Sequence, residues 1–230
     1  MDSKMKDTDY GTKKFSLSHE EYLRVTDASS GNTYCGSDQD WYETEGQRLR
    51  GCGPSAAANI LYYIYRKRNP NCCAKDKASL LIQMEEAWKY ITPRTNGIIS
   101  TSIFQKKVEA YAAAHDETFQ YFTLDVPESR EHRPKVIEVI HFLEKGLALD
   151  VPIAFLNLHN GKESRLERWH WVTVVSLEHG PNEEDAKAII CDEGLCKEID
   201  ISLWLNTSAL GGGFIYFTEF EPIQNSERTM

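Results

Sequence analysis

The sequence predicts an α+β protein in which N-terminal helices pack on a mostly antiparallel C-terminal sheet. Helical patterns dominate the first half of the chain, and runs rich in β-branched and aromatic residues dominate the second half. Helices that precede the strands, rather than alternate with them, are typical of this class. Because neither a repeat nor a linker is visible, we expect one domain over 1–230, with an N-terminal extension (1–46), a helical half (47–130) and a sheet-rich half (131–222).

The expected helices begin or end at capping residues, proline or glycine. They cover 16–22, 52–65, 78–91, 100–115, 134–146 and 199–206. The helix from Cys52 is the most telling, because Pro54 suits a first turn, where its missing N–H costs nothing. Gly51 and Gly53 beside it are expected to permit an unusual turn. The small residues Ala56 to Ala58 would let this helix lie close to neighbouring backbone, as a buried central helix does.

The expected strands are bounded by turn residues. They cover 118–124, 151–158, 169–177, 186–192 and 213–220. The segment 169–177 is the strongest of them, because it is almost wholly β-branched and aromatic after His170.

Composition narrows the class of protein. Apolar residues make up 41% of the 230 residues, enough for a full hydrophobic core. The net charge of −9 disfavours binding to nucleic acid. No run approaches the roughly 20 apolar residues of a membrane span. No apolar segment follows the charged stretch 1–14, so we expect a cytoplasmic location, and a secreted form stays open if the natural chain starts further upstream. Nothing indicates the oligomeric state.

The six cysteines do not match a metal-site spacing. No Cys-x-x-Cys pair occurs, so we expect neither a metal nor another cofactor. Cys72 and Cys73 fall in a predicted loop. Cys191 and Cys196 flank a short turn across which they could approach one another. We expect the cysteines other than Cys52 to be free thiols of a reducing compartment.

Cys52 is the candidate nucleophile. A cysteine attacks as its thiolate, and the unpaired N–H groups of a helix N-terminus favour negative charge there. The base must come from the seven histidines: His19, His115, His132, His141, His159, His170 and His179. His170 stands out because it begins the strongest strand, among neighbours where an imidazole needs a polar partner. The other six fall in polar segments, at a helix end, on an amphipathic helix or beside a turn.

Asp192 is the candidate partner of His170. A hairpin symmetric about Pro181 would make the two residues direct cross-strand neighbours. The carboxylate could then hold one ring nitrogen and present the other to the thiol. A slip of one residue would move Asp192 to the opposite face. For the oxyanion formed in acyl transfer, the candidate donors are the backbone N–H of Cys52 and the side chain of Gln47.

Four segments resemble papain-like cysteine peptidases, and most closely the bacterial branch related to the bacteriocin-processing, double-glycine peptidases. The segments are 47–61 (QRLRGCGPSAAANIL), 92–111, 169–172 (WHWV) and 189–194 (IICDEG), and the resemblance spans roughly 40–220. It implies a papain-like fold, a thiolate–imidazolium pair, a thioester intermediate and a peptide or protein substrate. Gln47 departs from the family, whose oxyanion glutamine usually lies about six residues before the cysteine, not five. The chain also lacks a transporter part, so its substrate need not be a double-glycine leader.

The sequence therefore predicts a cysteine peptidase or amidase with Cys52 as nucleophile, His170 as base and Asp192 as its orienting partner. The same residues would serve an acyltransferase with an acceptor other than water. A catalytically silent papain-like protein that binds a peptide or partner is the alternative from another class. A metal-binding protein using Cys191, Cys196 and His179 has poor ligand spacing.

Overall fold

The computed structural model describes residues 11–72, 74–182 and 184–220. Six α-helices lie in this part of the chain: α1 (Glu45–Arg48), α2 (Cys52–Arg68), α3 (Lys77–Tyr90), α4 (Thr101–Ala114), α5 (Val136–Ala148) and α6 (Ile201–Thr207). Three 3-10 turns cover Glu20–Leu23, Gln39–Trp41 and Arg130–His132. The strands are β1 (Lys13–Ser16), β2 (Arg24–Thr26), β3 (Thr33–Cys35), β4 (Phe119–Val126), β5 (Ile153–Asn157), β6 (His170–His179), β7 (Ala186–Asp192), β8 (Leu195–Asp200) and β9 (Gly212–Glu219).

The main sheet is antiparallel throughout, with the strand order β4-β9-β5-β6-β7-β8. Strand β1 pairs with the C-terminal part of β6, from Ser176 to His179, whereas β5 pairs with the N-terminal part of β6, from His170 to Val174. Strands β2 and β3 form a separate two-stranded ribbon. The expected α+β class is confirmed by this arrangement.

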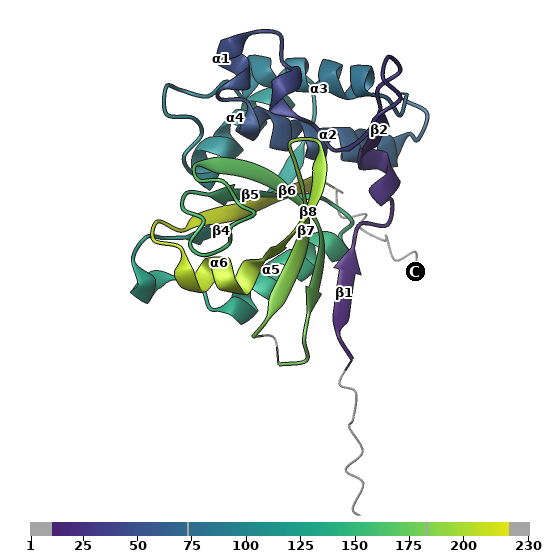
Figure 1. The fold of residues 1–230 in the computed structure, drawn as a ribbon. Helices are drawn as coiled ribbons and strands as arrows, with labels where there is room; N and C mark the ends of the chain where they lie inside the picture. The colour runs from purple at the N-terminus through teal and green to yellow at the C-terminus, as the bar shows by residue number, and fades with distance from the viewer. Residues whose placement is uncertain (1–10, 73, 183, 221–230) are drawn as a thin grey trace, which may run out of the picture.

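Helices cover both faces of the sheet, and β9 shows which helix lies on which face. Phe214 and Tyr216 both contact Phe142 of α5 through their rings. Gly213, the residue just before Phe214, lies so close to Thr101 of α4 that an added Cβ would be 2.7 Å from the Thr101 methyl group. Because successive residues of a strand point to opposite faces, α4 and α5 lie on opposite faces. Figure 1 shows the same layers, with α1 to α4 on one side of the sheet and α5 and α6 on the other.

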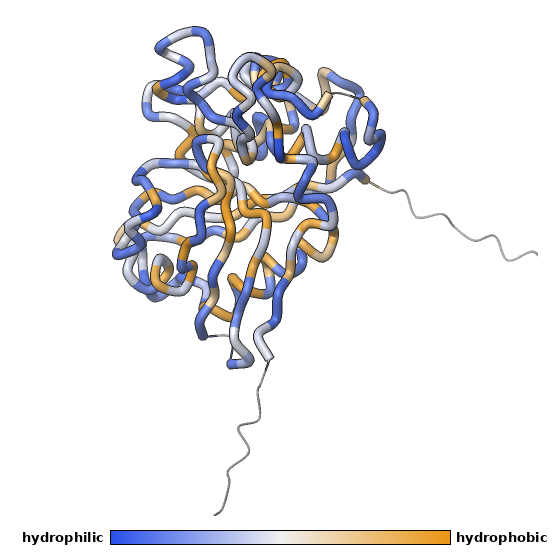
Figure 2. Tube along the Cα trace, turned by 45° about the vertical axis from the view of Figure 1, so that its right-hand side comes forward, coloured by the Kyte–Doolittle hydropathy of each residue, from blue (hydrophilic) through white to orange (hydrophobic). Residues whose placement is uncertain are grey.

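Helix α2 is the central helix of the molecule. Ala57, Ala58, Ile60 and Leu61 are fully buried, as the small and apolar residues of this segment predict. Burying a side chain such as Ile60 stabilises the fold by roughly 1.5–3 kcal/mol relative to leaving it exposed. In Figure 2 the hydrophobic segments run along the strands and helices of the interior, and the hydrophilic ones follow the loops at the rim. This burial fixes the position of the helix start, where Cys52 lies.

Several element predictions were wrong. Strand β8 was not expected at all, because its six residues, LCKEID, show no regular alternation of apolar and polar residues. The helix expected over 16–22 is a 3-10 turn at Glu20–Leu23. The predicted extension 1–46 contributes β1 to the main sheet. The boundaries within the expected single domain stay a prediction. No helix in the described part of the chain is both long and apolar enough to cross a bilayer.

Candidate active site

Cys52 is the first residue of α2, and its side chain is half-buried. The glycines beside it have a different role from the one expected. The backbone of Gly51 is ordinary right-handed helical, with φ −79°. A Cβ there would lie 2.6 Å from the ring of Tyr42, and one at Gly53 would lie 2.9 Å from Ile98. Both glycines are therefore needed for close packing around Cys52, rather than for an unusual turn.

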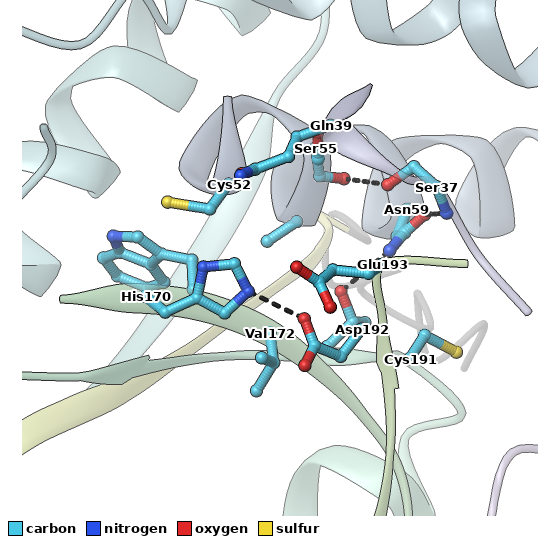
Figure 3. A pocket seen from close by; sticks show the side chains of 13 residues that line it. Ser37, Gln39, Cys52, Ser55, Asn59, His170, Val172, Cys191, Asp192 and Glu193 are labelled. Atoms are coloured by element: carbon cyan, nitrogen blue, oxygen red, sulfur yellow. Dashed lines mark hydrogen bonds and ion pairs between the residues drawn. The ribbon is translucent and has the colours of Figure 1, made fainter. Parts of the chain in front are cut away.

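His170 lies between Cys52 and Asp192 (Figure 3). Its Nε2 is 2.7 Å from Oδ1 of Asp192, and both side chains are buried. The other ring nitrogen, Nδ1, points toward the sulfur of Cys52 in Figure 3. The structure thus brings together the three residues that the sequence singled out, from the start of α2, the start of β6 and the end of β7.

The surroundings of His170 act on its pKa in opposite directions. Burial is the largest influence and lowers the pKa, because it penalises the charged ring. Hydrogen bonds to Asp192 and Cys52, together with their charges, outweigh it and raise the pKa of His170 to about 10. The site therefore favours the protonated, imidazolium form of His170.

Asp192 has a second cationic partner, which the sequence did not indicate. Its Oδ2 accepts a hydrogen bond of 2.7 Å from Nζ of Lys197, a β8 residue that also pairs with Glu193. Burial raises the pKa of the Asp192 carboxyl, but His170 and Lys197 together hold it below its usual value. The carboxylate is therefore ionised and held from two sides.

The register between β6 and β7 differs from the predicted one by two residues. Thr173 pairs with Cys191, so the next pair in this register sets Asp192 opposite Val172 rather than His170. Side chains alternate along a strand with a period of two, so Asp192 still lies on the face of His170. The register shifts by one residue between Val174 and Ser176. If the register of Ser176 to His179 continued without this bulge, Asp192 would be opposite Thr173, on the other face of the sheet from His170.

Gln39 is a residue of the site that the sequence analysis missed. A cavity beside the nucleophile is lined by Gln39, Cys52, Asn59, His170 and Asp192, among others. Figure 3 shows the Gln39 side chain next to Cys52. Its Oε1 is buried and has no hydrogen-bond partner among the described residues. Gln39 precedes Cys52 by 13 positions in a polar stretch, where no local signal distinguishes it.

Gln47 does not reach this cavity. Its Oε1 accepts hydrogen bonds from the backbone N–H and the hydroxyl of Thr44, and its Nε2 donates to Glu85 at 2.9 Å. Gln47 is thus the N3 residue of a capping box at the start of α1. The expected oxyanion role does not agree with this geometry, because the amide is used on both sides within the fold.

A second hollow adjoins Cys52, and its wall is mixed in polarity. It includes the polar residues Arg50 and Asn96 beside the apolar residues Ile98, Trp169 and Trp171. Trp169 is 56% exposed, although it is large and apolar. Its φ of +58° is unusual for a residue with a bulky side chain. The residue just before His170 is therefore held in a strained conformation at the mouth of the site.

The cysteines differ from the expectation of free thiols. Cys35 of β3 and Cys196 of β8 form a disulfide, whereas Cys52 and Cys191 are free thiols. Cys191 and Cys196 are direct cross-strand partners, so the expected approach across the turn does occur. Cys73 lies outside the described residues. A disulfide is typical of oxidising compartments, so it weighs against the cytoplasmic location, which stays a prediction.

The chain has a papain-like α+β fold, and the side chains of Cys52, His170 and Asp192 converge within it (Figure 3). A crystal structure of UfSP from C. elegans is similar to it, with a TM-score of 0.51 and 11% sequence identity. That likeness covers 91% of this chain and 35% of the UfSP chain, so this protein spans about a third of that chain's length. No protein-family model matches the sequence, and no curated protein matches it. At this identity the likeness shows the fold alone.

Proposed function

We propose that this protein is a cysteine peptidase or amidase that acts through a thioester acyl-enzyme on a peptide or protein substrate. One observation carries the proposal: the two ring nitrogens of His170 face an ionised carboxylate, Asp192, and the Cys52 thiol. This is the arrangement that activates a cysteine nucleophile. The papain-like fold supports the same class of activity.

The reaction follows from the positions of these groups. The Cys52 sulfur attacks the substrate carbonyl carbon, and the electron pair of the carbonyl moves onto its oxygen. The His170 imidazolium then gives its proton to the leaving amine as the C–N bond breaks. Neutral His170 takes a proton from water, whose oxygen attacks the thioester carbon. The C–S bond then breaks, its electron pair returns to the Cys52 sulfur, and the carboxylic acid is released. Asp192 accepts the hydrogen bond of Nε2 throughout, which keeps Nδ1 directed at the sulfur.

Gln39 replaces Gln47 as the proposed side-chain donor to the oxyanion. Its side-chain amide lies beside Cys52 in the same cavity (Figure 3), where the NH₂ group can donate a hydrogen bond to the oxyanion. The backbone N–H of Cys52 is the second proposed donor, because the first N–H groups of a helix have no acceptor within it. Two donors converging beside the nucleophile stabilise the developing negative charge.

Two finer questions belong to the same site. The first is whether water or another nucleophile accepts the acyl group, and the second is whether the substrate resembles a double-glycine leader. The resemblance to the bacteriocin-processing branch stays a prediction. A catalytically silent protein that only binds a peptide remains the alternative from another class.

The direct test is to trap the acyl-enzyme. The protein is mixed with short peptide p-nitrophenyl esters, quenched in acid and analysed by intact mass and peptide mapping. We expect one acyl group per chain on Cys52, with none in Cys52→Ala and strongly slowed formation in His170→Ala. His132→Ala is the matched control, because His132 is an exposed histidine in the 3-10 turn at 130–132.

The outcomes separate the alternatives. Loss of the acyl group from Cys52 in buffer alone would support the hydrolase. Loss of the acyl group only after an amine is added would support the acyltransferase. The absence of any adduct, or an equal adduct in Cys52→Ala, would contradict the proposal and favour the binding protein.

A further inference from the structure

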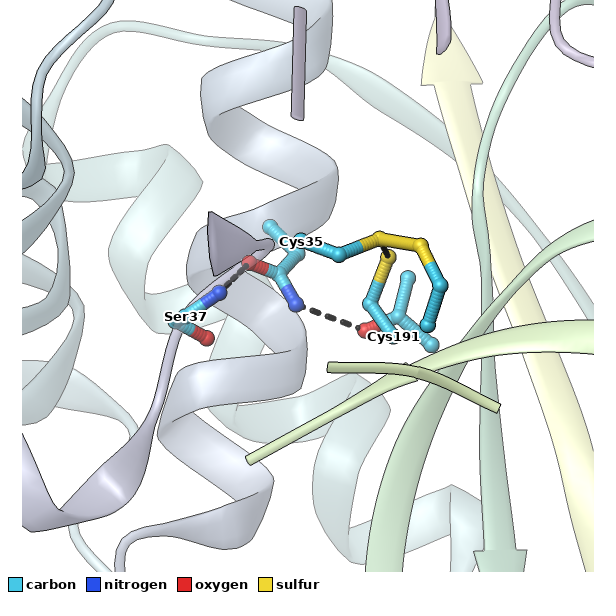
Figure 4. The surroundings of a disulfide bond; sticks show 6 residues. Cys35, Ser37 and Cys191 are labelled. Carbon is cyan, nitrogen blue, oxygen red and sulfur yellow. Dashed lines mark hydrogen bonds between the residues drawn. A yellow bond between two sulfur atoms is a disulfide. The ribbon is translucent and has the colours of Figure 1, made fainter. Parts of the chain in front are cut away.

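Three cysteine sulfur atoms lie close together near the candidate active site, and the proposed function uses none of them. They belong to Cys35, Cys191 and Cys196, and all three lie within 4.8 Å of one another. The free thiol of Cys191 is 2.9 Å from the sulfur of Cys35, beside the disulfide that joins Cys35 to Cys196 (Figure 4). Cys35 comes from β3, Cys191 from β7 and Cys196 from β8. The sequence indicated only that Cys191 and Cys196 could approach one another, and not that Cys35 would join them.

The backbone holds these strands together without the disulfide. Cys191 and Cys196 are opposed in the β7–β8 ladder. The N–H of Cys35 donates to the carbonyl of Gly194 at 2.7 Å, and the N–H of Gly194 donates to the carbonyl of Ser37 at 3.2 Å. The segment after Cys35 also lies tightly against β7, since a Cβ at Gly36 would be 2.9 Å from the Cβ of Cys191. Reduction of the disulfide would therefore leave three thiols gathered at one point.

We propose that in the reduced protein Cys35, Cys191 and Cys196 form a binding site for one thiophilic d¹⁰ metal ion such as Zn²⁺ or Cd²⁺. Thiolate–zinc bonds are about 2.3 Å long, so three thiolates on one ion lie roughly 4 Å apart. The observed cluster needs only a small expansion to reach that separation. Thiolates select soft ions over Mg²⁺ or Ca²⁺. Cys196 is exposed, which leaves the fourth position open to water.

The chemistry balances in two steps. A dithiol or phosphine reductant supplies two electrons, and the sulfurs of Cys35 and Cys196 each take up a proton as their bond breaks. A divalent ion then binds three thiolates, and the three thiol protons pass to solvent. The disulfide and the metal exclude one another, because the same two sulfurs take part in both. Cys35 of β3 is thus linked to the β7–β8 hairpin, which carries Asp192, in both states. The disulfide makes the link in the oxidised protein, and the metal ion makes it in the reduced protein.

The test uses the full chain with three cysteines left in place. Cys52→Ala, Cys72→Ser and Cys73→Ser together remove every other thiol, and the variant cannot form the proposed acyl-enzyme. This parent is reduced with a phosphine, desalted without oxygen and titrated with Cd²⁺. Bound metal is counted by native mass spectrometry and by the near-ultraviolet thiolate-to-cadmium absorption. We expect one Cd²⁺ per reduced chain and none per oxidised chain.

Two further variants keep the proposal falsifiable. Cys191→Ser retains the disulfide pair but removes the third ligand, and we expect it to lose stoichiometric Cd²⁺ binding after reduction. Cys196→Ser removes an exposed ligand on β8 and should lose binding even if Cys191→Ser fails to fold, as judged by circular dichroism. A reduced parent that binds no Cd²⁺, or a folded Cys191→Ser or Cys196→Ser that binds it as well as the parent, would overturn the proposal. Because Cys52 is absent, the outcome is independent of the proposed catalysis.

Discussion

His170 and Asp192 share a hydrogen bond of 2.7 Å although they are not directly opposed in the β6–β7 ladder. Asp192 continues the register opposite Val172 and reaches His170 diagonally. Diagonal neighbours on one face of a sheet lie within reach of long side chains, and a carboxylate and an imidazole span that distance. The bulge between Val174 and Ser176 keeps both residues on the same face.

Asp192→Asn should slow acylation of Cys52 by about 10²–10⁴-fold, because the amide no longer stabilises the imidazolium or fixes its orientation. The rate is measured with a peptide p-nitrophenyl ester under single-turnover conditions. Glu193→Gln is the matched control, since this neighbouring carboxylate binds Lys197 but not His170. An Asp192→Asn rate within a few-fold of the parent would mean that the carboxylate is merely structural.

Gln39→Ala and Gln47→Ala should have opposite effects. Loss of an oxyanion donor costs about 10²–10³-fold in kcat, so Gln39→Ala should slow catalysis with little change in stability. Gln47→Ala breaks the capping box with Thr44, so it should lower the free energy of unfolding by about 1 kcal/mol and leave kcat near the parent value. Urea unfolding and steady-state kinetics on both variants check this. The reverse pattern would restore Gln47 to the site.

The contrast between the two glutamines shows what the sequence could and could not predict. The helix from Cys52 and the strands around His170 and Asp192 follow from local patterns that depend on nearby residues. Gln39, Lys197 and the Cys35–Cys196 bond depend on chain segments brought together only by folding, and no local pattern reports them. The hairpin symmetric about Pro181 predicted that Asp192 lies beside His170, but the observed β6–β7 register differs from the predicted one by two residues. The sequence could not show this, because a bulge has no clear sequence signal.

Stability should fall with rising pH in a window set by His170. Its folded-state pKa of about 10 is above the ordinary value of 6.5, so folding takes up a proton there. The resulting stabilisation is fully present below about pH 6.5, and it is lost as the pH rises toward 10. Urea unfolding between pH 6 and 10 measures it. His170→Gln should remove this part of the pH dependence and His132→Gln should not; an unchanged slope in His170→Gln would contradict the assignment.

Loss of the Cys35–Cys196 disulfide should destabilise the protein by roughly 2–4 kcal/mol, because it closes a long loop of the unfolded chain. The separation of the two residues is 161 positions. Chemical unfolding of Cys35→Ser is compared with that of the oxidised parent, and Cys72→Ser, which changes an exposed cysteine outside this disulfide, is the control. Equal stability of Cys35→Ser and the parent would show that the backbone contacts around Gly194 hold this region unaided.

The most direct test of the central claim is the rate at which iodoacetamide alkylates each cysteine at pH 6, followed by peptide mapping. If His170 and Cys52 form an ion pair, Cys52 should react far faster than exposed Cys72, and buried Cys191 should be slowest. His170→Ala should remove the advantage of Cys52, whereas His132→Ala should preserve it. Equally slow alkylation of Cys52 and Cys72 in the parent protein would contradict an activated nucleophile and, with it, the proposed hydrolase.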